Sequence, residues 1–494
     1  MRKDMSGFLQ KIGDVIGEEQ LIFDEELLET YREAGPVAGF TPAGVVKPFG
    51  VGQVREIIRL AREESANLIF SSSSPPRFRG DTVPEEEGVI VDMSGMDNIV
   101  RIDRRNKVAL IEPGVTFPEL SAAAEKQGLK VLMPLLPRQG KSVITSCLER
   151  EPIQIPKYHW DMTDPLLCTE LVFGTGDVFR TGSAAGPGSL EQQWAAGGAQ
   201  KNPMGPAQTD FARLVQGSQG TLAAVTWATV KLELKPTIHK MYFVPGDGLP
   251  ELMEFTYRAL RPKLGDEFFI LNSYALATII ADDASQIESV ASRQSPYTVV
   301  YGVSGYAHHP AKRVNYQEKD LSDIAAETGC RITREIPGCT ADKMESILGD
   351  CSPAEYYKMQ PEGDFLDIFF LTTMDRVPFF ISKMEEVAEK FDYPPEQLGV
   401  YVQPIQHGRS VHLEFTLYYD GKDEEKAQQA EKLYKEASGT LAGVGAFFSR
   451  PYGDWADLSY SRCPDTVEVL RKIKKMLDPD GILNRGKLCF EEVK

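Results

Sequence analysis

The feature that most constrains the fold is a strand, a helix and a second strand that follow one another over residues 44–70. Residues 44–48 form a short strand that ends at a proline, and residues 54–64 carry apolar side chains every three to four positions. Residues 68–70, Leu-Ile-Phe, read as a buried strand. The succession predicts a βαβ unit. It ends in the loop 71–82, whose sequence SSSSPPRFRGDT is rich in small and polar residues.

Beyond this loop the apolar pattern changes twice. Up to Pro236 it predicts strands at 88–92, 99–103, 108–112, 169–173, 177–181 and 223–234, with a helix at 117–127. From about 240 to 445 it predicts strands at 241–244, 268–271, 297–301, 367–370, 399–406 and 411–419, and helices at 249–260, 311–328, 377–391 and 424–436. Long helices packed on an antiparallel sheet make the expected fold class α+β.

Charge and composition exclude several functional classes. The chain has 494 residues, 54 of them Lys or Arg and 72 Asp or Glu, so its formal net charge is −18. Such an acidic protein repels a phosphate backbone, so nucleic acid is not an expected partner. No apolar run reaches the ~18 residues that a membrane span needs. The seven cysteines are scattered and contain no Cys-x-x-Cys pair, which predicts a cytoplasmic protein without a disulfide framework.

Two short motifs resemble nucleotide-binding loops but lack the residues that those loops need. The residues Gly140, Lys141 and Ser142 match the end of a P-loop, yet Leu135 stands where that loop requires its first glycine. Residues 174–176, Gly-Thr-Gly, lack the third glycine of a Rossmann fingerprint and read as a tight hairpin between two strands. Neither a P-loop nor an NAD-binding Rossmann domain is therefore expected.

Four other segments together resemble one family of flavoproteins. They are residues 112–116 (EPGVT), 170–182 (ELVFGTGDVFRTG), 217–222 (GSQGTL) and 477–487 (LDPDGILNRGK). In this order and at these separations they resemble the vanillyl-alcohol oxidase and p-cresol methylhydroxylase family, which also includes FAD-linked glycolate and D-lactate dehydrogenases. The stretch from Ser142 to Met162, with Leu148-Glu149-Arg150 and Tyr158-His159-Trp160, is most similar to the vanillyl-alcohol oxidase branch.

The resemblance implies FAD as the cofactor and a division of the chain into three parts. An FAD-binding domain of the p-cresol methylhydroxylase type would comprise residues 1–235, with two subdomains split near 85. A substrate cap of antiparallel sheet and helices would follow at 236–445, and residues 446–494 would return to the FAD domain. The implied cofactor-binding residues are Ser72, Ser73, Ser74, Arg77, Arg79, Gly80, Ser142, Thr145, Glu149, Gly217, Ser218, Gly220, Thr221, Val225, Asn484 and Lys487.

The residue types in these segments suit a dinucleotide. Backbone N–H groups must converge on a pyrophosphate, and small residues allow that close approach. In the loop 71–82 serines replace most of the family's glycines, while Arg77 and Arg79 can supply positive charge. The segment 142–152 is expected as a second loop that faces the flavin, with Cys147 as a packed small residue rather than a nucleophile.

The substrate side offers a basic and aromatic cluster and a pair of histidines. In the family, the region that holds Arg450 and Tyr452 lines the substrate cavity, and Tyr460 follows close behind. Arginine can grip a carboxylate or stabilise a phenolate. His407 and His412 could belong to a metal site, but the Glu-His-Gly motif of the dehydrogenase branch is missing. Residues five apart on a strand also face opposite sides, so we expect no metal and one histidine as base or hydrogen-bond donor.

These residues predict an FAD-dependent enzyme that takes a hydride from a small hydroxylated substrate. The substrate would be a 4-substituted phenol or a 2-hydroxy acid, and the branch resemblance favours the phenol. The alternative is the FAD subunit of a larger complex that passes electrons to an iron–sulfur or cytochrome partner. A homo-oligomer and a flavoprotein fold without catalysis also remain open.

Overall fold

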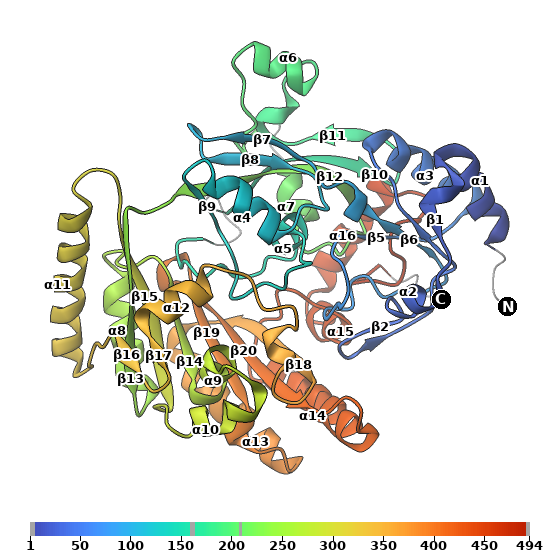
Figure 1. The fold of residues 1–494 in the computed structure, drawn as a ribbon. Coiled ribbons are helices and arrows are strands. Elements are labelled where there is room, and N and C mark those ends of the chain that lie inside the picture. The colour runs from blue at the N-terminus through green and yellow to red at the C-terminus, as the bar shows by residue number, and fades with distance from the viewer. Residues whose placement is uncertain (1–4, 159–163, 207–209, 491–494) are drawn as a thin grey trace.

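Three larger β-sheets organise the part of the chain that the computed structural model describes, namely residues 5–158, 164–206 and 210–490 (Figure 1). Two sheets occupy the upper part of Figure 1, and the third lies below them with its helices. Helices and antiparallel sheets are mixed, so the predicted α+β class is confirmed.

The first sheet contains the predicted βαβ unit. Its strands run in the order β1 (Leu21–Ile22), β4 (Val45–Val46), β6 (Val89–Asp92) and β5 (Leu68–Ser71). The strands β4 and β5, joined by α3 (Val51–Glu64), both pair in parallel with β6, which lies between them. The change of sheet therefore comes after Asp92, not near residue 85, because β6 completes the first sheet. Helix α1 (Ser6–Ile16) and α3 share an apolar cluster with this sheet.

The second sheet is antiparallel and surrounds the longest strand, β12 (Ala223–Leu234). Its strands are β7 (Ile99–Asp103), β8 (Val108–Ile111), β9 (Leu129–Val131), β10 (Leu166–Phe173), β11 (Val178–Arg180) and β12. The tight hairpin predicted at 174–176 is confirmed, because β10 and β11 pair on either side of it. Helix α4 (Phe117–Glu125) begins with a capping box between Thr116 and Glu119 and packs on β9.

The third sheet forms the cap. Its order is β13 (Ile238–Gly246), β15 (Tyr297–Gly305), β14 (Phe268–Asn272), β19 (Gly399–Ile405), β20 (Ser410–Tyr419) and β18 (Asp364–Thr372). One apolar cluster joins it to α8 (Leu249–Leu260), α11 (Pro310–Thr328), α13 (Val377–Lys390) and α14 (Glu424–Gly443). A second cluster on other side chains of the sheet contains α9 (Ser273–Ile280), α10 (Ile287–Ala291) and α12 (Ala341–Leu348).

The remaining described elements are short or lie near the C-terminus. They are α2 (Glu25–Glu29), β2 (Glu33–Ala34), β3 (Val37–Ala38), α5 (Val143–Leu148), α6 (Leu190–Ala195), α7 (Phe211–Val215), β16 (Glu335–Ile336), β17 (Cys339–Thr340), α15 (Trp455–Tyr460) and α16 (Pro464–Leu477). After α16 the chain returns to β5: the backbone N–H of Leu68 donates to Ile482 at 2.8 Å, and that of Asn484 donates to Leu68 at 2.9 Å. The C-terminal segment thus reaches the first sheet, as Figure 1 also shows.

Strand β20 presents apolar side chains to one face of the third sheet and mostly polar side chains to the other. Because successive side chains of a strand point to opposite faces, its apolar and polar residues separate cleanly. Val411, Leu413, Phe415 and Leu417 belong to the cluster that contains α13 and α14. The residues that alternate with them are His412, Glu414, Thr416 and Tyr418. The strand therefore supports a packed core with one face and polar chemistry with the other.

We expect Leu413→Ala to destabilise the cap strongly. Leu413 is fully buried, and truncation of such a side chain to alanine typically costs about 2–5 kcal/mol because it leaves a cavity. Chemical denaturation should show a lower free energy of unfolding by that amount. The control is Val469→Ala on α16, where the side chain is 55% exposed and the change should stay within about 0.5 kcal/mol. Equal effects of the two substitutions would contradict this assignment of the core.

Candidate active site

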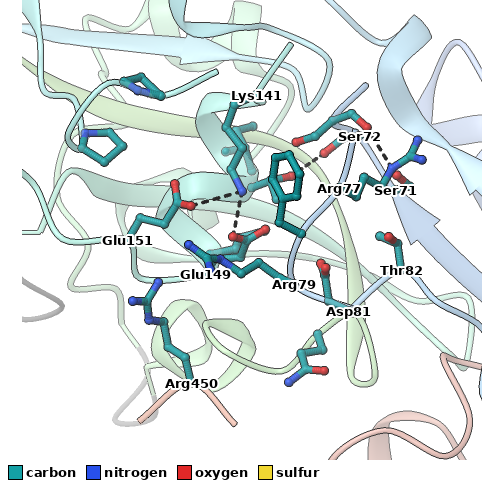
Figure 2. A pocket seen from close by; sticks show the side chains of 18 of the residues that line it. Ser71, Ser72, Arg77, Arg79, Asp81, Thr82, Lys141, Glu149, Glu151 and Arg450 are labelled. Atoms are coloured by element: carbon teal, nitrogen blue, oxygen red, sulfur yellow. Dashed lines mark hydrogen bonds and ion pairs between the residues drawn. The ribbon is translucent and has the colours of Figure 1, made fainter. Parts of the chain in front are cut away.

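A large central cavity lies where the two upper sheets meet the cap. It encloses about 1570 Å³ of empty space, its open mouth included. Four parts of the chain line it: the loop after β5, the segment around α5, the loop before β12, and the cap together with residues 450–452. Figure 2 shows labelled side chains from the loop after β5, from the segment around α5 and from Arg450 converging on the same space. Of the four segments that carry the family resemblance, 112–116 and 217–222 contribute residues to the lining, whereas 170–182 and 477–487 do not.

Most of the predicted site residues line this central cavity. Those that do are Ser72, Ser73, Arg77, Arg79, Thr145, Glu149, Gly217, Ser218, Gly220, Val225, Arg450 and Tyr452. Those outside its lining are Ser74, Gly80, Ser142, Thr221, Asn484, Lys487, His407, His412 and Tyr460. Charged or aromatic residues that sequence reasoning did not single out also line it: Asp81, Arg138, Lys141, Glu151, Tyr356, Lys358, Tyr401 and Glu414.

The segment 142–152 is partly helical and not a continuous loop. Ser142 caps α5 with its hydroxyl oxygen, which accepts from the Thr145 N–H at 3.1 Å, and this pairing starts the helix. Its own N–H donates to the Ser73 hydroxyl at 3.1 Å, and Thr145 shares a hydroxyl–hydroxyl contact of 2.5 Å with Ser72. Ser142 is fully buried behind the lining, so it holds in place the loop 71–82, which we call the serine loop. Cys147 packs against the second-sheet cluster, and burial raises the pKa of its thiol.

Positive charge gathers at the serine loop. Arg77 donates to the Ser73 carbonyl at 3.2 Å and lies 3.8 Å from the ring centre of Tyr31, while Arg138 donates to the Ser74 carbonyl. Among the described residues neither guanidinium has a carboxylate within ion-pair distance. Burial lowers the pKa of both arginines, which reflects the loss of water around an uncompensated charge. This end of the cavity suits a group with several anionic oxygens.

The loop before β12 is held by the C-terminal segment. Asn484 donates its side-chain amide to the carbonyls of Asp81 at 2.9 Å and Gln219 at 2.6 Å, so it ties the two cavity loops together. Thr221 is fully buried and donates to the Ser218 carbonyl at 2.7 Å. Lys487 is buried in an ion pair with Glu85 at 2.7 Å. These three predicted residues support the cavity wall from behind.

The residues at this end fit FAD. Gly217 and Gly220 have φ angles of 72° and 71°, which glycine adopts at little cost, and a Cβ at Gly220 would meet no atom within 4 Å. Within the described structure the Thr82 hydroxyl and the Asn484 side-chain oxygen are buried without a hydrogen-bond partner. Open space beside glycine, buried polar atoms and the two cationic side chains Arg77 and Arg138 together match the needs of a dinucleotide.

A buried ammonium group separates two carboxylates at the middle of the cavity wall. Lys141 lies 2.7 Å from Glu149 and 3.5 Å from Glu151, and Figure 2 shows its side chain between them. Burial raises the pKa of Glu149 to about 7, although Lys141 opposes the shift. Glu151 has the opposite shift: Lys141 and nearby arginines outweigh its burial and lower its pKa to about 2.

At the cap end, a chain of polar contacts connects Arg79 to Arg450. Arg79 and Lys358 pair with Asp367 at 3.1 and 2.8 Å. The same lysine pairs with Glu414 at 2.5 Å, and His412 continues the chain from Glu414 at 3.3 Å to Arg450 at 3.4 Å. We refer to these six residues as the charged chain.

Arg450 ends the charged chain without a carboxylate of its own. It is 5% exposed and its guanidinium lies 4.0 Å from the ring centre of Phe369, but no carboxylate of the described residues lies within ion-pair distance. Burial lowers its pKa. A buried cation that faces a cavity is favourable only when an anion binds there or the charge is otherwise offset. This end of the cavity therefore suits a single anionic oxygen.

The two histidines take different positions. His412 is buried and contacts Arg450 and Glu414 from outside the cavity lining, so it is placed to orient the arginine and not to meet a substrate. Burial lowers its pKa, which keeps the imidazole neutral near pH 7. His407 lies in the turn between β19 and β20 and also does not line the cavity. Tyr460, on α15, is half-buried outside the lining.

Aromatic rings form the wall beside these charges. The ring centre of Phe78 lies 5.4 Å from that of Tyr356 and 4.8 Å from that of Phe365. Tyr401 and Tyr452 complete the aromatic surface, and burial raises the pKa of both hydroxyls well above the ordinary tyrosine value. The cap end of the cavity thus combines flat apolar surface with one unpaired cation.

Comparisons with known proteins agree with this geometry. The family described as "FAD binding domain" matches residues 42–143, and the family described as "FAD linked oxidases, C-terminal domain" matches residues 371–488. The chain is 29% identical to the glycolate oxidase subunit GlcD of Bacillus subtilis, over 94% of this chain and 92% of the relative. It is 24% identical to the 4-cresol dehydrogenase flavoprotein subunit of Pseudomonas putida, over 97% and 94%.

Solved structures show the same fold over the whole chain. A substrate-bound p-cresol methylhydroxylase superposes with a TM-score of 0.84 at 18% identity, covering 100% of this chain and 98% of that one. The 4-ethylphenol oxidase of Gulosibacter chungangensis has a TM-score of 0.82, also at 18% identity, and covers 99% and 98%.

Fold and sequence thus define an FAD-linked oxidoreductase, with FAD as its cofactor. The predicted resemblance to the p-cresol methylhydroxylase type of FAD-linked oxidases is confirmed by the two matching domain families and by these relatives. The stretch that resembles the vanillyl-alcohol oxidase branch includes residues 159–162, which lie outside the described residues. Among the described residues no helix is long and apolar enough to cross a membrane.

We expect Gly220→Trp to yield a folded protein without bound FAD. The new side chain would enter the open space beside Gly220, where we place the cofactor. The flavin absorbance of the purified protein, relative to its protein absorbance, measures the loss. Gly220→Ala is the matched control, because it carries the same unfavourable φ of 71° without the bulk and should remain yellow. Unchanged flavin content in Gly220→Trp would contradict our placement of this loop.

Proposed function

We propose that the enzyme takes a hydride from a small hydroxylated aromatic molecule, a 4-substituted phenol, and passes it to FAD. The observation that carries this proposal is the buried guanidinium of Arg450, which faces an aromatic cavity without a carboxylate partner among the described residues. A flat ring would pack against Tyr356 and Tyr401, while its oxygen would accept hydrogen bonds from Arg450.

The chain's own residues would bind the substrate and stabilise its charge. Arg450 would hold the substrate's oxygen and favour its anionic form, because a fixed cation in a cavity with little water stabilises developing negative charge. Tyr452 lines the cavity beside it and could share the hydroxyl proton. His412 would orient the guanidinium, since it contacts the Arg450 side chain from the side away from the cavity. FAD, when bound, supplies the hydride acceptor.

A 2-hydroxy acid is the second candidate substrate. Two further cationic side chains, Arg79 and Lys358, line the cavity close to Arg450 in the charged chain and could receive a carboxylate. Both already pair with carboxylates of the protein, whereas Arg450 does not, so one anionic oxygen fits this site better than two. Anaerobic bleaching of the flavin with a panel of phenols, 2-hydroxy acids and sugars distinguishes these classes.

The electron acceptor of the reduced enzyme is a separate question. One relative is named as a flavoprotein subunit, and a D-lactate dehydrogenase of Arabidopsis thaliana, 28% identical over 91% of this chain and 74% of the relative, is named with a cytochrome. These names support the alternative that this chain passes electrons to a redox partner. Reoxidation by oxygen, compared with reoxidation by a cytochrome, tests that alternative.

We expect Arg450→Met to slow flavin reduction by at least about tenfold while FAD stays bound. Loss of a charge-assisted hydrogen bond made in the transition state costs ~1.5–3 kcal/mol, or about 10- to 150-fold in rate. Stopped-flow reduction under anaerobic conditions, with the substrate that the panel identifies, measures the effect. Arg462→Met makes the same chemical change outside the cavity and should leave the rate unaltered. An unchanged rate in Arg450→Met would show that this arginine only supports a domain junction.

We also expect the purified enzyme to contain less than one equivalent of zinc, manganese or iron. Within the described parts of the chain, no group of three or more His, Cys, Asp or Glu side chains could hold a metal ion. Elemental analysis of the holoenzyme measures the content. A full equivalent that disappears in His407→Ala or His412→Ala would overturn this expectation.

A further inference from the structure

Three charged residues around α5 form an arrangement that the proposed substrate grip does not use. Lys141 precedes the helix, Glu149 and Glu151 follow it, and the helix brings the ammonium group back between the two carboxylates. All three residues line the central cavity, and Lys141 and Glu149 are 7% and 8% exposed. Figure 2 shows the lysine joined to both glutamates in the middle of the cavity wall.

One ammonium group cannot fully compensate two buried carboxylates. Two such groups in a site with little water do not both ionise readily, and the one with weaker support keeps its proton to higher pH. Glu151 has the stronger support: it accepts from the Ser146 hydroxyl at 2.6 Å, and the charges of Arg79 and Arg450 also act on it. Glu149 accepts a side-chain hydrogen bond from Lys141 alone among the described residues, so burial favours its protonated form more than that of Glu151.

Charged and titratable groups reach Glu149 from several segments. Those that face it are Lys141 and Glu151 in its own segment, Asp81 in the serine loop, Arg138 ahead of α5 and Tyr452 in the C-terminal segment. The interaction with Tyr452 matters for function, because that tyrosine lies beside Arg450 in the proposed substrate site. Glu149 thus lies on the same cavity wall as the groups that would hold the substrate's oxygen.

We propose that Glu149 accepts the proton of the substrate's hydroxyl group and that Lys141 and Glu151 are positioning residues that set its readiness to do so. The proposal rests on the proposed function. In the step, the substrate's O–H bond breaks and the proton moves to a carboxylate oxygen of Glu149, directly or through Tyr452. The hydride leaves the carbon that bears the hydroxyl or is conjugated to it, and FAD receives both electrons. A carboxyl group that titrates near the working pH is suited to this task.

Infrared difference spectroscopy of the holoenzyme at a series of pH values tests the tuning without any substrate. The band of a protonated carboxyl group should decrease near pH 7 and be lost in Glu149→Gln. Glu151→Gln removes a neighbouring negative charge, so the transition should move to lower pH by about one unit or more. Lys141→Met removes the stabilising cation, so the transition should move to higher pH by a similar amount. Shifts in the same direction, or none, would overturn the proposal.

Two controls separate this arrangement from general effects of burial. Lys130→Met removes a buried ammonium from its pair with Glu267 outside the cavity and should leave the transition in place. Asp164, whose pKa burial raises to about 6, also lies outside the cavity lining and should retain its own band in every variant.

The role in catalysis is tested by the pH dependence of flavin reduction. In the native enzyme the rate should rise with pH through the infrared transition, because the ionised carboxylate is the acceptor. In Glu151→Gln the profile should shift with the infrared transition to lower pH. A profile that does not follow it would show that Glu149 titrates without taking the proton. If no compound of the panel reduces FAD, the proposed function fails, whereas the infrared result still decides the tuning.

Discussion

The loss of water around charged side chains is the constraint on which the cavity of this enzyme depends. Ammonium, guanidinium and carboxylate groups are costly to bury alone, so each must find a partner. The charged chain pairs such groups from three parts of the protein. Arg79 comes from the serine loop, Lys358 and Glu414 come from the cap, and Arg450 comes from the segment that follows the cap. These ion pairs hold the cap against the serine loop. Arg450 has no carboxylate within ion-pair distance among the described residues, so it can still bind an anion.

Much of the fold and part of the lining at both ends of the cavity could be predicted from sequence. Helical spacing, period-two strands and turn residues are local signals, so the βαβ unit and the cap strands were found in their observed places, although β13, β15 and β18 are longer than predicted. The glycines near 217–220 and the pair Arg450 and Tyr452 could be predicted from residue type alone. Glycine allows close approach of the backbone, and arginine and tyrosine bind anionic oxygens; both sets of residues line the cavity. Strand β6 illustrates the limit: its existence was visible, but its place between β4 and β5 depends on pairing across the chain.

The rest of the site depends on contacts between residues that are far apart in the sequence, and no local sequence pattern predicts such contacts. Lys358 and Glu414 are 56 positions apart. Lys358 lies in a helical turn at 357–359 that contacts β18, and Glu414 lies on β20, which pairs with β18, so neither residue stands out in the sequence. Lys141 was visible only as part of an incomplete P-loop motif, and its partners follow a helix that was predicted as a loop. One of His407 and His412 was predicted as a base or hydrogen-bond donor; His412 contacts Arg450 but does not line the cavity. Whether a histidine points toward a cavity follows from packing that one sequence cannot reveal.

The return of the chain to β5 affects how the protein can be made. Residues 482–484 contact Leu68, and the Asn484 side chain fixes two loops of the central cavity, so the first sheet and these loops are complete only after residues 482–484 have been synthesised. More than 400 residues separate Asn484 from the Asp81 carbonyl that it binds. Contacts of such sequence separation form late and slowly. The ribosome must therefore translate the whole third sheet before residues 482–484 can join the first sheet, which makes closure of the central cavity a late event in the maturation of the enzyme.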